Sequence, residues 1–312
     1  MSLPRRIPNF RECWALSRAA ADGWVDDNAS SMGAAIAYYT MLSLAPLLLI
    51  VITIAGLIFG EDAARGALFG ELAHLVGTHG AQAIQATLSS ASSVSGGIVS
   101  ITVGVITLFI GATTVFAELQ SDLDRIWRAP PRPGSGLRRF IRTRLLSFGV
   151  IIAVGFLLIV SLVASAGIAA VGLLWNRWMP GTELLLQVLN FVVGLAVITA
   201  LFALIYKLLP SRPIAWGDVG IGAAVTSLLF SVGKFLIGLY LGKAAISSSF
   251  GAAGALVVVV VWVYYSAQIF LLGAEFTWHY ARRHGSLRGT TRDEAPLTAH
   301  CEATTRSTMP DA

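Results

Sequence analysis

Charged residues are scarce in this sequence. They make up 12% of its 312 residues, while hydrophobic residues make up 55% and the mean hydropathy is +0.73. A soluble domain carries about a quarter charged residues, because its surface faces water. The shortage of charge therefore excludes a single soluble core, and it predicts a protein whose outside mostly faces lipid.

Cysteine and the sequence motifs of common enzymes are missing or nearly so. Cys13 and Cys301 are the only cysteines. We interpret both as free thiols, because they fall in segments predicted to lie in the cytoplasm, where disulfides are rare. The sequence has no HExxH, CxxC or GxSxG motif and no phosphate-binding loop with GKS or GKT. We therefore expect no enzymatic activity, no cofactor and no metal ion.

Long apolar runs, by contrast, are abundant. A membrane-spanning helix needs about 20 mostly apolar residues to cross the hydrocarbon core. None of the runs shows the period of two that is typical of barrel strands. We predict an all-α, polytopic membrane protein with six transmembrane helices and a transmembrane domain over residues 34–283. The spans lie near residues 34–59, 98–118, 145–174, 184–209, 217–241 and 252–280.

Arginine and lysine are distributed unevenly around these spans. Of the 22 basic residues, 18 lie on one alternating set of flanks and connections, which includes both termini. The positive-inside rule then places the N- and C-termini in the cytoplasm. We attribute the net charge of +5 to this orientation and to contact with anionic lipid headgroups, the expected partners on the cytoplasmic side. We expect no nucleic-acid partner. Whether the protein assembles into a homo-oligomer stays open.

Three segments outside the spans have patterns of their own. The cytoplasmic segment 1–33 carries apolar residues at helical spacing, which predicts an amphipathic interfacial helix. These residues are Phe10, Trp14, Ser17, Ala21 and Trp24. The loop over residues 61–97 is too long for a simple connection, and we expect a small helical cap on the outer face. Residues 284–312 are polar and are predicted to be disordered.

An acidic cluster follows the second predicted span. It comprises Glu118, Asp122 and Asp124, and Arg125 and Arg128 come next. Acidic and basic residues at these spacings can pair along a helix. We therefore predict a solvated, self-neutralising helix end at this position, and no metal site.

Ionisable residues inside the spans are candidate functional residues, because charge is costly in lipid. A lysine at the centre of a span costs roughly 2.5–3.5 kcal/mol on insertion scales, and Lys234 lies past the midpoint of the fifth span, toward the outer side. Glu275 lies in the sixth span and shares one helix face with Tyr264, Gln268 and His279. Two interpretations stay open for each charge. Lys234 either snorkels to the outer headgroups or lines a polar path, and Glu275 either is held by a cytoplasmic arginine or lines the same path.

The first predicted span contains AYYTMLSLAPLL, with Pro46 in its interior. Proline removes a backbone hydrogen bond and clashes with the preceding turn, so we expect a kink at Pro46, which is the candidate hinge. Tyr38, Tyr39 and Ser43 can satisfy the freed carbonyl groups. They are also candidates for lining a substrate path.

Five blocks of the sequence occur in a characteristic order. They are AAIAYYTMLSLAPLLL (34–49), LDRIW (123–127), LLPSRPIAWGDVGIGA (208–223), KFLIGLY (234–240) and WVYYSAQIFLLGAEFT (262–277). Together they resemble the signature blocks of the YihY/BrkB family of bacterial inner-membrane proteins, some of which are labelled ribonuclease BN-like. The resemblance covers roughly residues 10–283.

The resemblance implies a location in the bacterial cytoplasmic membrane. It also makes ten residues motif positions: Tyr38, Tyr39, Ser43, Pro46, Trp127, Pro210, Lys234, Tyr240, Tyr264 and Glu275. Asp124 departs from the pattern, because many members have asparagine there. The resemblance implies no mechanism. The ribonuclease label does not fit this sequence, because no water-facing domain carries a metal cluster or an acid–base pair.

We therefore predict a transporter, exporter or lipid-handling protein for an amphiphilic or charged substrate. Lys234 and Glu275, on adjacent helices, would line a polar path or bind a charged head, and the kinked first span would supply movement. The alternative is a membrane scaffold or partner-binding protein whose charges only fix helix packing. A ribonuclease is the third interpretation, and it needs clustered metal ligands on a cytoplasmic loop.

Overall fold

The structure, a computed structural model of the chain, describes residues 10–60, 114–130, 183–243 and 246–288, and isolated residues at 62, 66, 69, 70, 82, 85, 111 and 157. The long helices are α1 (Phe10–Asp26), α2 (Ala29–Phe59), α6 (Glu183–Leu208), α7 (Trp216–Lys243) and α8 (Ile246–Arg283). A further helical segment covers residues 114–126. The described residues form helices and turns with no strand, which agrees with the all-α prediction.

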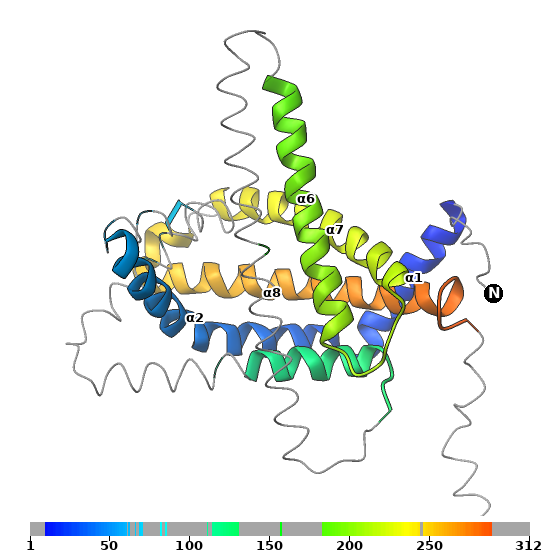
Figure 1. The fold of residues 1–312 in the computed structure, drawn as a ribbon. Helices are drawn as coiled ribbons and strands as arrows, with labels where there is room; N and C mark the ends of the chain where they lie inside the picture. Colours follow the sequence, from blue (N-terminus) through cyan, green and yellow to red (C-terminus); the bar gives the residue numbers. More distant parts are fainter. Residues whose placement is uncertain are drawn as a thin grey trace, which may run out of the picture.

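The central helix of the described structure is α8. It packs against α7, α2 and α1, and Figure 1 shows these helices and the 114–126 segment lying around it. From Ala267 onward most of its side chains are buried, and Ala267, Ala274 and Ala281 recur every seven residues. Small side chains at such spacing allow neighbouring helices to approach closely. The C-terminal half of α8 therefore forms the core of the bundle.

Three described helices are long and apolar enough to cross a membrane. These stretches are Gln187–Leu208 in α6, Trp216–Ile237 in α7 and Val257–Arg283 in α8. They coincide with the spans predicted near 184–209, 217–241 and 252–280. The first predicted span, 34–59, is covered by α2 as one helix. The spans near 98–118 and 145–174, the cap at 61–97 and the end of the tail lie almost wholly outside the described residues, so the total of six stays a prediction.

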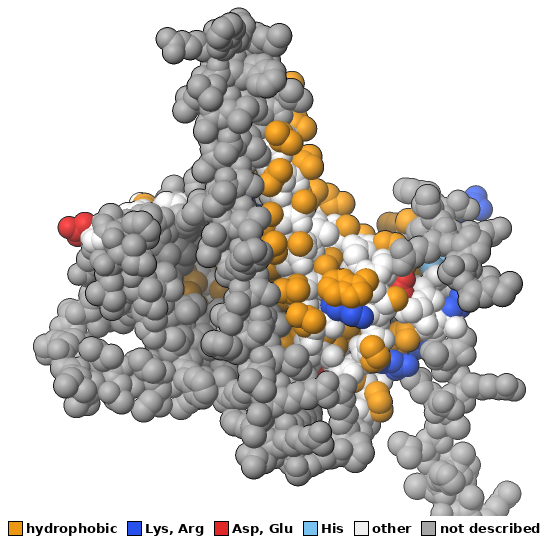
Figure 2. All heavy atoms as spheres, in the orientation of Figure 1, with side chains coloured by type: hydrophobic (Ala, Val, Ile, Leu, Met, Phe, Trp, Pro, Cys, Tyr) orange, Lys and Arg blue, Asp and Glu red, His pale blue; other side chains and the backbone are white. Residues whose placement is uncertain are grey.

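A large apolar face runs along α6. Figure 2 shows hydrophobic side chains following the length of this helix. Leu184, Val188, Phe191 and Val192 are each more than half exposed. Soluble monomers rarely expose apolar patches of this extent, whereas contact with lipid chains favours them. The face thus agrees with the lipid-facing exterior that the composition predicts.

The N-terminal segment forms the predicted helix, α1. Leu16 and Ala20 of α1 pack against Phe276 and Tyr280 of α8. Trp14, which belongs to the predicted apolar stripe, is 70% exposed. The face of α1 that contacts α8 therefore lies beside the predicted apolar stripe. Contact of the stripe itself with the membrane interface stays a prediction.

Candidate functional site

Glu275 lies in the buried half of α8 and is 1% exposed. Its Oε2 atom is 3.7 Å from Nε2 of His279, one turn further along the helix. The same oxygen faces Gly23 of α1, where an added Cβ atom would lie only 2.7 Å away. Glycine at this position therefore allows α1 to approach the carboxyl group. As a result, Glu275 faces protein and is shielded from lipid.

A second buried carboxyl group, Asp27, lies in the turn between α1 and α2 and is 3% exposed. The turn has Asn28 at φ 56°, a left-handed conformation that asparagine tolerates better than most residues. Oδ1 of Asp27 is 3.1 Å from a terminal nitrogen of Arg128. The Asp27 carboxyl group also lies within hydrogen-bonding reach of Glu275. We call Asp27, Arg128, Glu275 and His279 the carboxyl-pair site.

One oxygen on each of these two carboxyl groups has no hydrogen-bond donor among the described residues. The atoms are Oδ2 of Asp27 and Oε1 of Glu275, and both are buried. Buried polar atoms in proteins are nearly always paired, so these two oxygens are exceptional. An ionised carboxylate only accepts hydrogen bonds, so neither group can satisfy the other when both are charged.

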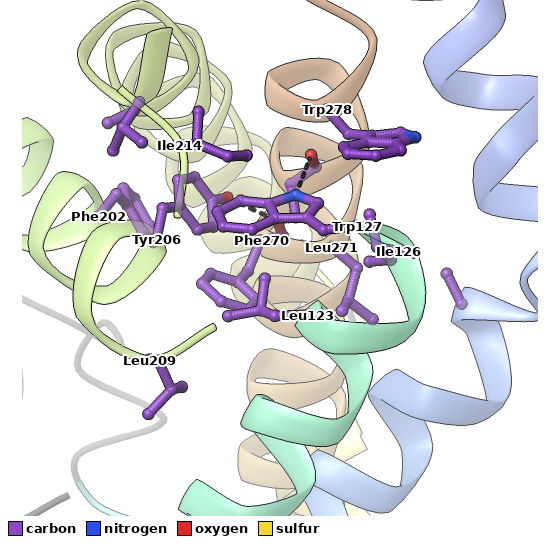
Figure 3. Close-up of a cluster of buried hydrophobic side chains, with 14 of the residues drawn as sticks. Leu123, Ile126, Trp127, Phe202, Tyr206, Leu209, Ile214, Phe270, Leu271 and Trp278 are labelled. Atoms are coloured by element: carbon purple, nitrogen blue, oxygen red, sulfur yellow. Dashed lines mark hydrogen bonds between the residues drawn. The ribbon is translucent and has the colours of Figure 1, made fainter. Parts of the chain in front are cut away.

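Trp127 anchors the segment that supplies Arg128. Its indole is fully buried, and Nε1 donates a 3.1 Å hydrogen bond to the carbonyl oxygen of Ala274 in α8. Figure 3 shows the indole between α8 and the aromatic side chains of α6. Its ring lies 6.2 Å from that of Tyr206, whose hydroxyl donates to the carbonyl oxygen of Phe270 over 2.7 Å. Trp127 therefore links the segment to both helices, one residue before Arg128.

The turn between α6 and α7 holds the same segment from the other side. The carboxylate of Asp124 accepts hydrogen bonds from the backbone N–H (2.6 Å) and the hydroxyl (2.7 Å) of Ser211. Arg212 donates to the carbonyl oxygens of Trp127 (3.4 Å) and Arg128 (3.1 Å). These carbonyl groups lie at a helix C-terminus, where they lack intrahelical donors. The family-like blocks LDRIW and LLPSRP thus contact each other.

Basic and tryptophan side chains gather near the C-terminus of α8. The guanidinium carbons of Arg212 and Arg282 lie 5.1 Å and 5.3 Å from the ring centroid of Trp278. Lys207 lies 5.6 Å from the ring of Trp216. Neither arginine forms an ion pair with a carboxylate in the described part of the chain. We call these five residues the basic–tryptophan cluster. A stacked guanidinium keeps its N–H edge available for an anion.

Lys234 and Glu275 are not brought together by the fold. Their helices, α7 and α8, pack side by side as predicted. However, Gly233 faces Ile269, which is six residues before Glu275 along α8 and so about 9 Å away along the axis. Lys234 is exposed, whereas Glu275 is buried toward α1. Among the described residues, the carboxyl group that interacts most strongly with Glu275 is that of Asp27. A role for Lys234 stays a prediction.

The other predicted residues of α8 and the tyrosine pair of α2 lie in different surroundings. Gln268 faces α2, and its Nε2 is 3.5 Å from the carbonyl oxygen of Ser30. Tyr264 is half-buried. Tyr38 is 63% exposed, and its ring packs edge-on against Tyr39 at 5.6 Å. Gln268 and Glu275 therefore both face the region where α1 and α2 meet, while Tyr38 lies on the outside.

Ser43 and Pro46 lie further along α2. Ser43 is buried, and its hydroxyl donates to the carbonyl oxygen of Thr40 over 3.0 Å. An added Cβ at Gly111 would lie 2.8 Å from Cβ of Ser43, so the two backbones are close. α2 continues as one helix through Pro46, and Figure 1 shows its two halves pointing in different directions. The side chain of Pro46 lies outside the described set, and hinge movement stays a prediction.

Asp27 and Arg212 were not recognised as site residues from the sequence. Asp27 follows Asp26 in the cytoplasmic segment, seven residues before the first predicted span begins at residue 34. Arg212 lies between two prolines in the short turn that connects two spans. A charged residue beside a predicted span is the signal that could have identified both positions.

The acidic cluster at 118–124 is not the solvated, self-neutralising helix end that was predicted. Asp122 is 5% exposed, and its Oδ2 atom has no donor among the described residues. Asp124 accepts from the α6–α7 turn, and Arg128 pairs with Asp27. The cluster is therefore partly buried, and its members have separate partners.

Asp122 should make the stability of the fold depend on pH. Burial, followed by the charge on Glu118, raises the pKa of Asp122 to about 7, while Arg125 opposes the rise. The folded protein keeps this proton up to about pH 7, whereas the unfolded chain releases it near pH 4. Stability should therefore fall as the pH rises through that window, by at most about 4 kcal/mol.

The substitution Asp122→Asn should flatten this part of the profile of melting temperature against pH, measured in detergent. The matched control is Asp22→Asn on the exposed side of α1, which should keep the slope of the parent protein. A parent-like slope in Asp122→Asn would contradict the assignment.

The apolar spans and exposed apolar faces define an integral, helical membrane protein that crosses the bilayer more than once. The family model Virulence factor BrkB matches residues 20–298, and the chain belongs to this family. No solved structure matches the chain.

Several relatives named UPF0761 membrane protein are similar to this chain. The Rhodospirillum centenum protein is 28% identical over 88% of this chain and 59% of its own length. The Tolumonas auensis protein is 29% identical over 52% of each. The Vibrio parahaemolyticus protein is 26% identical over 78% of this chain and 74% of its own. The chain thus spans only 52% to 59% of the length of the first two relatives.

Proposed function

We propose that this protein is a transporter or lipid-handling protein of the bacterial inner membrane, with both termini in the cytoplasm. Its substrate would be an amphiphile with an anionic, phosphate-type head. One observation carries this function: Arg212 and Arg282 lie on Trp278 without a carboxylate partner among the described residues.

The chemistry of the basic–tryptophan cluster suits a phosphate head. A guanidinium group presents a planar set of N–H donors that matches phosphate oxygens, and stacking on an indole pre-orients it. Tryptophan favours the depth of the lipid headgroups, and Trp216 is 59% exposed. Exposed apolar residues of α6 and α7 lead away from this end, among them Leu228, Val232 and Phe191. A bound amphiphile could place its head on the cluster and its chains along this face.

Arg282 is the residue that tests the substrate class. Its described contact is the ring of Trp278, whereas Arg212 also binds backbone carbonyl groups. Arg282→Gln should therefore weaken the binding of phosphatidylglycerol about tenfold, as expected for the loss of one charge-assisted contact. The binding can be measured as the rise in melting temperature with added lipid. Arg283→Gln, which removes the exposed neighbouring charge, is the matched control and should bind like the parent protein.

Transfer of a fluorescent phosphatidylglycerol between the leaflets of proteoliposomes is the functional readout. The parent protein should accelerate this transfer, and Arg282→Gln should reduce it. Equal transfer of a phosphatidylcholine probe would contradict the anionic substrate class. A well-folded protein that moves neither lipid would contradict the transport function itself.

A membrane scaffold is the second candidate function. It is favoured by the hydrogen bonds of Asp124, Trp127 and Arg212, which fix helix packing. A scaffold would respond to Arg282→Gln with a change in stability that does not depend on the lipid added. Neither function requires catalysis, and within the described ranges no group of three or more His, Cys, Asp or Glu side chains is placed to hold a metal ion.

A further inference from the structure

The carboxyl-pair site contains more negative charge than its arginine neutralises. Arg128 contacts Asp27 at 3.1 Å, and its own side chain is 49% exposed. Among the described residues, the basic group in direct contact with Glu275 is the imidazole of His279, at 3.7 Å, while the charge of Arg128 acts on Glu275 without an ion-pair contact. The titratable and charged groups around the pair come from α1 and its turn, the 114–130 segment and α8: Asp26, Asp27, Arg128, His279, Arg282 and Arg283. When both carboxyl groups are ionised, one of the two buried charges therefore has no arginine or lysine in ion-pair contact among the described residues.

The unpaired oxygens show where that charge can be neutralised. Oδ2 of Asp27 and Oε1 of Glu275 are buried without donors, and the two carboxyl groups are within hydrogen-bonding reach. A carboxyl–carboxylate hydrogen bond needs one proton between the two groups, because an ionised carboxylate cannot donate. Two like charges this close in a buried site cannot both be kept without such a proton.

We propose that Asp27 and Glu275 hold one exchangeable proton between them, and that this proton fastens the α1–α2 turn to α8. The proton reaches solvent through the His279 side, because that side chain is 26% exposed and adjoins Oε2 of Glu275. When the proton leaves, two carboxylates face each other beside a single arginine, and the turn is pushed away from α8. Gly23 packs directly on Oε2 of Glu275, so α1 must move with the turn.

This proton site would couple a proton gradient to the movement of helices, and only that use rests on the proposed transport function. Proton binding itself is independent of any substrate. It involves α1, α2 and α8 at the carboxyl-pair site, whereas substrate binding is assigned to the basic–tryptophan cluster. The two assignments can therefore fail separately.

Infrared difference spectra of the full-length protein in lipid test the site. The C=O band of a protonated carboxyl group should disappear as the pH is raised, and Asp122→Asn serves as the background because Asp122 titrates too. In that background, Glu275→Gln and Asp27→Asn should each abolish the remaining band, while His279→Gln should keep it. The Asp122→Asn protein with ¹³C-labelled aspartate or glutamate assigns the remaining band without substitution of the pair, and both labels should shift it.

A band that persists in both Glu275→Gln and Asp27→Asn would overturn the shared proton. The absence of any titrating carboxyl band in the isotope-labelled Asp122→Asn protein would overturn it as well. Lipid transfer measured on the same samples separates the two ideas. A titrating band without lipid transfer would leave the proton site and reject the transport function. Lipid transfer without a titrating band would support the transport function and reject the proton site.

Discussion

Replacing Trp127 by alanine should leave little folded protein. The indole is fully buried, and truncation of a buried aromatic side chain costs about 3–5 kcal/mol. The carbonyl oxygen of Ala274, which lies inside α8, would also lose the indole as a second donor, at a net cost of about 0.5–1.5 kcal/mol. Proteins of this size retain only about 5–15 kcal/mol of stability. The yield of monodisperse protein in detergent and its melting temperature measure the effect.

Two further substitutions separate packing from hydrogen bonding at this position. Trp127→Phe keeps an aromatic ring and removes the N–H donor, so its melting temperature should fall between those of the parent and Trp127→Ala. Trp14→Ala makes the same change of residue type at a position that is 70% exposed, and it should fold like the parent. Equal losses in Trp127→Ala and Trp14→Ala would show that the 114–130 segment is not anchored by its tryptophan.

Gly222→Ala should be the second most damaging change, although it adds a single methyl group. The new Cβ would lie 1.9 Å from Oγ1 and 2.7 Å from Cβ of Thr277, so α7 would have to move away from α8. Overpacking of a close contact costs about 1–3 kcal/mol. We expect a lower melting temperature and, because α8 carries Glu275, a disturbed carboxyl-pair site.

Gly220→Ala is the matched control for this prediction, two residues away on the same helix. No atom lies within 4 Å of an added Cβ at Gly220, so the change should be neutral or slightly stabilising. Thr277→Ala removes two of the three clashing atoms, and combining it with Gly222→Ala should recover part of the lost stability. Similar melting temperatures for the two glycine variants would rule out a tight contact between α7 and α8 at this level.

The class of protein and the positions of its apolar helices were determined by the sequence alone. The length of an apolar run is a local property, and the thickness of the bilayer sets the length that a span requires. For this reason α6, α7 and α8 lie where the apolar runs predicted them. The face of α8 that carries Gln268 and Glu275 was also readable, because a helix places residues three and four apart on one side.

The partners of the charged residues were decided only by the tertiary structure. The sequence paired Lys234 with Glu275 because their helices are adjacent, but adjacency does not determine the rotation and height of each side chain. Those depend on which small residues meet, and Gly23 brings α1 onto Glu275. Helical spacing likewise paired Asp124 with Arg128. However, Arg128 has φ 49° and lies beyond the helix end, so it turns to Asp27 while Asp124 binds Ser211.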